Sequence, residues 1–160
     1  MNEQEYKQIV NDILVDIFND ILKVEHKAID AFAPTPLTMS EMHIIEAVGK
    51  MTDLQMSEIA RKLRVTLPTL TVSVDRLEEK GYIQRRRSDQ DRRRVTIVLT
   101  PKGQKAFDDH AAFHAQMVDA LFDNLGIDKM PVLMDSFSKL RDFFKENAER
   151  FYGDQHQINR

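Results

Sequence analysis

MSEIARKLRVTLPTLTVSVDRLEEKGYI, residues 56–83, is the stretch that decides the fold. Apolar residues at helical spacing predict a short helix over residues 56–63. A second helix is expected to begin after Thr66, a good N-cap residue, with Pro68 in the first turn, where the missing N–H of proline costs nothing. Gly81 is the C′ residue expected just past its end. Two helices joined by so short a connection indicate a helix-turn-helix.

The residues after Gly81 change from a helical to an alternating apolar pattern. YIQRR (82–86) and RVTIVLT (94–100) predict two strands, joined by the polar run SDQDRR (88–93). Six arginines and no lysine lie in this hairpin, which favours phosphate recognition over a merely solvated surface: Arg85, Arg86, Arg87, Arg92, Arg93 and Arg94. A basic hairpin that follows a helix-turn-helix indicates a winged helix-turn-helix.

Four further helices are expected. Residues 3–32 form a long helix with isoleucine every fourth residue, and its apolar face is wide enough to need cover from its own domain and from a partner subunit. A capping box at Thr38 begins a helix that ends near Met51. Thr100 caps a long helix that runs to about residue 122, and a last amphipathic helix begins near residue 128.

Charge is unevenly distributed along the chain. The net charge is −3, but residues 61–94 hold eleven Lys and Arg against five Asp and Glu. The rest of the chain holds 12 basic and 21 acidic residues, so one basic segment lies in an acidic body. This asymmetry predicts a local contact with a polyanion.

Composition also excludes several kinds of site. There is no cysteine, which excludes disulfides, thiolate zinc sites and cysteine redox sensing. No apolar run approaches a membrane span of ~18 residues, and the polar start MNEQEYKQ lacks the features of a signal peptide, so no membrane contact and a cytoplasmic location are expected.

Double-stranded DNA is the polyanion that this pattern fits. A helix beginning at Thr66 suits the major groove, its N-terminus attracts phosphate, and short hydroxyls there can reach base edges. An arginine in the hairpin suits a narrow, electronegative minor groove, and Asp91 is placed to orient one. The alternative is that Thr66 only caps its helix and its neighbours are ordinary surface residues. The predicted DNA-binding residues are Thr66, Pro68, Thr69, Thr71, Ser73, Arg76, Arg87, Asp91, Arg92 and Arg93.

Residues 56–83, followed by RSDQDRRRVTIVLTPKG (87–103), resemble the core of the MarR family of transcription regulators. The resemblance implies a mainly α fold with a small β-hairpin wing, in the order of four helices, two strands and two helices. It implies one MarR-type domain over residues 1–160, with a winged helix-turn-helix DNA-binding lobe at 38–100 and dimerisation helices at 1–33 and 101–152. It also implies a homodimer on a palindromic operator, in which Asp91 fixes Arg93 and Arg93 enters the minor groove.

Four segments are similar to the fatty-acid-synthesis repressor subgroup called FabT: EMHIIEAVGK (41–50), VTLPTLT (65–71), RSDQDRR (87–93) and FHAQMV (113–118). The likeness implies repression of lipid-synthesis genes, with acyl carrier protein carrying a long acyl chain as corepressor. The chain departs from that pattern at Pro68, where a smaller residue such as glycine is expected, and in most of the last helix. These departures leave the DNA sequence and acyl chain length open.

The expected effector pocket combines flexible apolar side chains, which adapt to an acyl chain, with histidines at its rim: Met39, Met42, His43, Met51, His110, His114 and Met117. Basic Arg61, Lys62 and Arg64 are expected to dock the acidic carrier protein. His110 and His114 also have the i, i+4 spacing of metal ligands, and Glu25, His26, Glu41 and His43 lie on helices that could approach them. Zinc-sensing members of the MarR family use similar positions. We nevertheless expect that the protein has no cofactor and no metal; the alternative is a regulator that answers to zinc or to a small aromatic or lipophilic ligand.

Two other classes compete with a DNA-binding regulator. A metal-dependent hydrolase using His110 and His114 would need a general base, and the sequence has no HExxH motif, nucleophile elbow or glycine-rich phosphate loop. No enzymatic activity and no catalytic residues are therefore expected. A winged helix that binds only protein would not require the six hairpin arginines.

Overall fold

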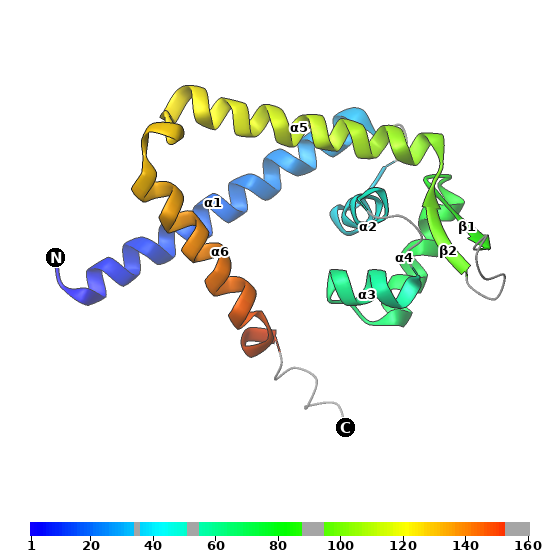
Figure 1. Ribbon diagram of the computed structural model, residues 1–160, viewed down its shortest axis with the longest axis horizontal. Coiled ribbons are helices and arrows are strands. Elements are labelled where there is room, and N and C mark those ends of the chain that lie inside the picture. The colour runs from blue at the N-terminus through cyan, green and yellow to red at the C-terminus, as the bar shows by residue number, and fades with distance from the viewer. Residues whose placement is uncertain (34–35, 51–54, 88–94, 153–160) are drawn as a thin grey trace. The chain divides into compact units, whose positions relative to one another are not determined.

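The computed structural model describes residues 1–33, 36–50, 55–87 and 95–152. The elements follow the expected order (Figure 1) and comprise α1 (Glu3–Phe32), α2 (Met39–Gly49), α3 (Met56–Leu63), α4 (Leu67–Glu79), β1 (Ile83–Arg87), β2 (Val95–Leu99), α5 (Pro101–Leu125), a 3₁₀ turn η1 (Ile127–Lys129) and α6 (Pro131–Tyr152). The chain divides into two compact units, Met1–Phe113 and His114–Arg160. The mainly helical winged-helix fold expected from the sequence is confirmed.

The core of the first unit surrounds α2. This helix packs against α3, α4 and β2, and α1 also contacts it. The buried stripe of α4, formed by Leu70, Val74 and Leu77, belongs to this core. Burying each large aliphatic side chain contributes about 1.5–3 kcal/mol, so the core holds α4 by one face and leaves its opposite face outside.

The turn between α3 and α4 is made by Arg64, whose backbone has a positive φ of 55°. The N–H of Val65 donates to the carbonyl of Ala60 at 3.0 Å, which closes α3 with the bond pattern that glycine usually provides. Thr66 then caps α4 through the N–H of Thr69. α4 is also followed by a residue with a positive φ, Gly81, whose φ is 76° and whose position was expected from the sequence.

A salt bridge ties the C-terminus of α4 to the N-terminus of α2. The Lys80 ammonium lies 2.8 Å from the Glu41 carboxylate and donates to the carbonyl of Pro36 at 2.9 Å. Glu41 also closes the capping box by accepting from the N–H of Thr38. The Glu41 side chain is only 4% exposed, so its charge depends on these partners.

The hairpin is joined to α5 through Thr100. β1 and β2 pair antiparallel, with Ile83 opposite Leu99 and Arg87 opposite Val95. The Thr100 hydroxyl lies 2.7 Å from the carbonyl of Gly81 and accepts from the N–H of Gly103. Gly103 lies against the backbone of Tyr82, where a Cβ would overlap the carbonyl oxygen of Tyr82. The first turn of α5 therefore packs directly on the hairpin backbone.

The second unit differs from expectation at its helix boundaries. α5 runs to Leu125 rather than to residue 122, and α6 begins at Pro131 rather than near residue 128. Gly126, with a φ of 57°, ends α5, and η1 fills the interval up to Pro131. Proline favours the first position of a helix, which explains the later start of α6. Within the described ranges, the helices lack any stretch that is both long and apolar enough to cross a membrane.

Gly103→Ala is expected to destabilise the protein. The new Cβ would overlap the Tyr82 carbonyl oxygen, so α5 must move away from the hairpin, at a cost of about 1–3 kcal/mol that exceeds the gain in helix propensity. Denaturant unfolding measures the difference. Gln104→Ala, at the exposed neighbouring position, is the control and should change stability little. Equal stability of the two variants would contradict the close approach.

Glu41→Gln tests the salt bridge as a function of pH. Burial alone would raise the pKa of Glu41, but hydrogen bonds and the charge of Lys80 outweigh burial, so its pKa is lowered from 4.5. The ionised form therefore stabilises the fold above this ordinary value, and that contribution is lost as pH falls through the lowered pKa. Urea unfolding should show the variant less stable by about 1–3 kcal/mol at neutral pH, with the difference disappearing as the pH falls below the lowered pKa of Glu41. A difference that stays constant with pH would contradict this account.

Candidate nucleic-acid interface and adjoining ligand sites

Hydroxyl groups crowd the first two turns of α4. The Thr66 and Thr69 hydroxyl oxygens lie 2.7 Å apart, and the Thr71 hydroxyl donates to the carbonyl of Leu67 at 2.8 Å. The Ser73 hydroxyl donates to the carbonyl of Thr69 at 3.3 Å. Each hydroxyl that gives its proton to the helix keeps its oxygen lone pairs free. In this arrangement Thr71 and Ser73 are suited to accept hydrogen bonds, as from the exocyclic amino groups of adenine or cytosine.

The outward face of α4 lies opposite the buried stripe. At 100° per residue, the residues of α4 turned farthest from Leu70 and Val74 are Pro68, Val72, Arg76 and Glu79. Val72 is 51% exposed and was not among the residues predicted from the sequence, which apart from Pro68 were chosen for hydroxyl or charged groups. An exposed aliphatic side chain here offers an apolar contact of the kind that a thymine methyl group makes. Its signal was available in the sequence, since Val72 falls outside the buried stripe.

The structure describes some of the predicted DNA-binding residues but not all of them. Thr66, Pro68, Thr69 and Arg76 are exposed, and Thr71 and Ser73 are half-buried, all at the cap or on α4. Arg87 ends β1. The remaining three, Asp91, Arg92 and Arg93, lie outside the described residues.

The hairpin is attached to α4 by Arg85. Its N–H donates to Glu78 at 3.0 Å, and its guanidinium pairs with the carboxylates of Glu78 and Asp75. The hydrogen bond to Asp75 is the largest effect that raises the pKa of Arg85 above its usual value. These contacts join β1 to α4, and the sequence analysis predicted that both belong to the DNA-binding surface.

A surface pocket of about 260 Å³ opens beside α4. Its walls come from α2, the end of α3 and the first half of α4, and its lining comprises Ser40, His43, Ile44, Leu63, Val65, Thr69, Leu70 and Ser73. The lining is mostly apolar with a few hydroxyl groups and one imidazole, which suits a small amphiphilic molecule. Thr69 and Ser73 thus belong both to the pocket and to the predicted DNA-binding set.

The expected effector residues are not gathered in that pocket. Among those in the described part of the chain, only His43 lines it. Met42 is fully buried, and Met39 packs against the core from a partly buried position. Met117 is half-buried on α5 within the second unit, and Met51 lies outside the described residues.

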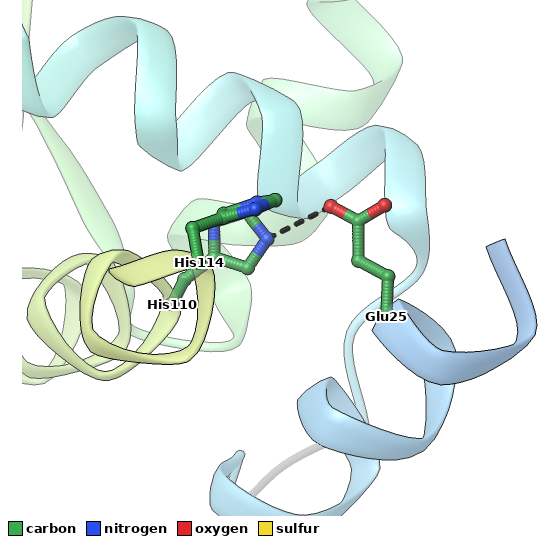
Figure 2. A group of neighbouring side chains, drawn as sticks. All are labelled: Glu25, His110 and His114. Atoms are coloured by element: carbon green, nitrogen blue, oxygen red, sulfur yellow. Dashed lines mark hydrogen bonds and ion pairs between the residues drawn. The ribbon is translucent and has the colours of Figure 1, made fainter. Parts of the chain in front are cut away.

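His110 and Glu25 form a buried pair (Figure 2). His110 Nε2 lies 3.0 Å from Glu25 Oε1, with His110 1% and Glu25 7% exposed. His114 is one turn further along α5, and one ligand atom from each of the three side chains lies within 4.8 Å of the others. Two imidazoles and a carboxylate are a donor set that zinc accepts. His26 and Glu41, which the sequence placed near these histidines, are not in the group.

The Glu46 carboxylate on α2 is electrostatically linked to this region. Burial would raise its pKa, but its hydrogen bond with Lys50 and the charges of Lys50, His110 and His43 together lower it. The charges of His110 and of His43, which lines the pocket, thus both act on the Glu46 carboxylate of α2.

Comparison with known proteins identifies the family. The MarR family model matches residues 37–95. The crystal structure of Streptococcus pneumoniae FabT in complex with DNA is 36% identical, covers 88% of this chain and 98% of that chain, and superposes with a TM-score of 0.81. The chain belongs to the MarR family. FabT is therefore both a fold neighbour and a sequence relative of this MarR-family protein.

Curated relatives are transcriptional regulators of the helix-turn-helix type. The repressor MdtR of Bacillus subtilis (strain 168) is 26% identical over 102 residues, which are 64% of this chain and 66% of MdtR. The regulator YfiV of the same organism is 34% identical over 71 residues, 44% of each chain. This MarR-family chain thus spans less than two thirds of the length of both relatives. The family makes it a transcriptional regulator.

Proposed function

We propose that this MarR-family protein is a sequence-specific DNA-binding repressor, that it acts as a homodimer, and that it has no enzymatic activity. The observation that carries the proposal is α4, which is held by one buried stripe and presents a capped N-terminus with exposed threonines on its free side. The basic segment 61–94 includes this helix and the arginines of the hairpin. The structure of its relative FabT in complex with DNA supports DNA as the polyanion.

The homodimer follows from the exposed apolar surface of α1. Ile9, Ile13, Ile17 and Ile21 share one face of the helix, and each is between 42% and 52% exposed. Phe18 on the same helix is 63% exposed. Continuous apolar surface of this kind on a soluble chain indicates an interface. A second copy is the proposed occupant, since two-fold pairing would give two α4 helices for two half-sites about one DNA turn, ~10 base pairs, apart.

The proposed effector is a long acyl chain carried by acyl carrier protein, acting as corepressor of fatty-acid biosynthesis genes. The resemblance of four segments to the FabT subgroup supports it, as does the FabT neighbour. Arg61, Lys62 and Arg64 are exposed at the end of α3, where an acidic carrier can reach them. If the carrier raises DNA affinity, DNA must raise carrier affinity by the same factor, typically ~1–3 kcal/mol.

Zinc is the second candidate effector, favoured by the group of Glu25, His110 and His114. The buried hydrogen bond between His110 and Glu25 would be replaced by two metal bonds, with His114 as the third protein ligand. The ion would supply a fixed positive charge beside the carboxylate of Glu46 on α2. Its regulatory effect would therefore pass through α2 to α4.

Arg93→Ala tests DNA binding. The variant is expected to lose about 1–3 kcal/mol of binding to the duplex that the wild-type protein selects from a random-sequence pool, because one groove contact is removed. Asp91→Ala should lose less, since Arg93 keeps its charge. Fluorescence anisotropy measures both, and Arg141→Ala on α6 is the matched control. Unchanged affinity of Arg93→Ala would refute the role assigned to the hairpin.

Ile13→Asp combined with Ile17→Asp tests the homodimer. Light scattering is expected to give twice the chain mass for the wild-type protein at micromolar concentration. The variant is expected to have the mass of one chain, because pairing would bury the two new aspartate charges in the subunit interface. Gln8→Asp, on an exposed polar position of α1, should remain dimeric. A monomeric wild-type protein would contradict the proposal.

A DNA titration with three additions distinguishes the effectors. Acylated carrier protein, but not unacylated carrier, is expected to tighten binding by about fivefold to 150-fold. If zinc alone changes the affinity and a chelator reverses it, the acyl proposal is wrong and zinc is the effector. His110→Gln should then abolish the zinc effect, while His26→Gln, an exposed histidine outside the group, should keep it.

A further inference from the structure

Arg85 reaches from β1 back to α4 with both its backbone and its side chain. Its N–H donates to Glu78 Oε1 at 3.0 Å, while its guanidinium pairs with Glu78 Oε2 and Asp75 Oδ1. Asp75 and Glu78 are three residues apart, so both carboxylates lie on the same side of the helix. One side chain of the hairpin is thereby fixed to two consecutive turns of α4.

The position of Arg85 in the hairpin directs it toward the helix rather than outward. Arg85 pairs across the strands with Ile97, and directly paired residues share one face of a sheet. Ile97 is 1% exposed and belongs to the core, so this face is the inner one. The Arg85 side chain remains 33% exposed, and its guanidinium is already engaged by two carboxylates. Arg85 therefore differs from an arginine that is free to bind phosphate.

A two-stranded hairpin by itself is marginally stable, and its direction depends on what it packs against. Here the hairpin and α4 together form the proposed DNA interface, so the angle between them decides whether both meet one duplex. We propose that Arg85 is a positioning residue for DNA binding: with Asp75 and Glu78 it fixes the hairpin against α4 and makes no DNA contact itself. The inference rests on the proposed DNA-binding function.

Neutralising the two carboxylates tests the proposal, because the two explanations predict opposite changes in DNA affinity. Asp75 is 52% and Glu78 37% exposed, so both carry negative charge beside a surface proposed to meet phosphates. If charge alone matters, neutralising them will strengthen DNA binding. If they position the hairpin through Arg85, neutralising them will weaken binding although the protein becomes more positive.

The experiment uses the full-length protein and the duplex that the wild type selects from a random-sequence pool. Asp75→Asn combined with Glu78→Gln is expected to weaken binding on the order of tenfold, as is Arg85→Gln. The triple variant should be no weaker than Arg85→Gln alone, because contacting residues of one unit are not additive. Tighter binding by the variant that lacks the two carboxylates would overturn the proposal.

Salt dependence separates positioning from contact. Removing one phosphate contact lowers the slope of log affinity against log salt concentration by about 0.9. Arg85→Gln is expected to shift the line without changing its slope, and Arg85→Lys should recover only part of the affinity, since an ammonium cannot bridge two carboxylates as a guanidinium does. A reduced slope for Arg85→Gln would show a direct contact and overturn the proposal.

Two controls test whether the variants bind DNA more weakly because they unfold or because they have lost a positive charge. Thermal unfolding midpoints of the variants should lie within a few degrees of the wild type, since partly exposed ion pairs contribute at most about 1 kcal/mol to stability. Arg141→Gln, which removes one positive charge from α6, should leave affinity unchanged. A pool that yields no duplex with the wild-type protein would count against DNA binding itself, and with it against this role of Arg85.

Discussion

The Lys80 side chain holds together the elements on which the interface is built. Its ammonium joins the chain just before α2 to the capping box of that helix, through Pro36 and Glu41. Its own carbonyl accepts from the Lys102 ammonium of α5, which also lies 4.3 Å from the centre of the Tyr82 ring. The end of α4 is thus fixed to α2 and to α5 within one turn of helix. Because this end is fixed, the position of the free N-terminal half of α4 is determined by the core beneath it.

Much of this fold could be predicted from the sequence because the signals are local. Thr38, Thr66 and Gly81 specify helix ends by hydrogen bonds within four or five residues, and the structure shows each in that role. Arg64 was not recognised as a left-handed residue, since arginine has no preference for positive φ. The limits of α5 and α6 were also missed, because a glycine and a proline five residues apart define a 3₁₀ turn only together.

Contacts between distant residues were harder to predict. The pairing of Glu25 with His110 spans 85 residues, and the sequence analysis named Glu25 only as one of four side chains that could approach His110 and His114. The ties of Arg85 to Asp75 and Glu78 were not predicted because the six hairpin arginines were considered together, as a sign of phosphate recognition. Residue type indicates the chemistry that a side chain can perform, whereas its partner decides whether that capacity is already used. Arg85 shows the difference.

The pocket beside α4 has a consequence for the direction of regulation. Thr69 and Ser73 line it and also belong to the predicted DNA-binding set. If Thr69 and Ser73 contact DNA as proposed, a molecule seated in the pocket would compete with the duplex for the same hydroxyl groups and would act as an inducer. The Glu25 and His110 pair is buried and lies on α1 and α5, apart from that set, so an effector there and DNA can be bound together. On the proposed DNA interface, the sign of an effector's action would therefore depend on where the effector binds: an occupant of the pocket beside α4 would derepress, while one at the Glu25 and His110 pair could corepress.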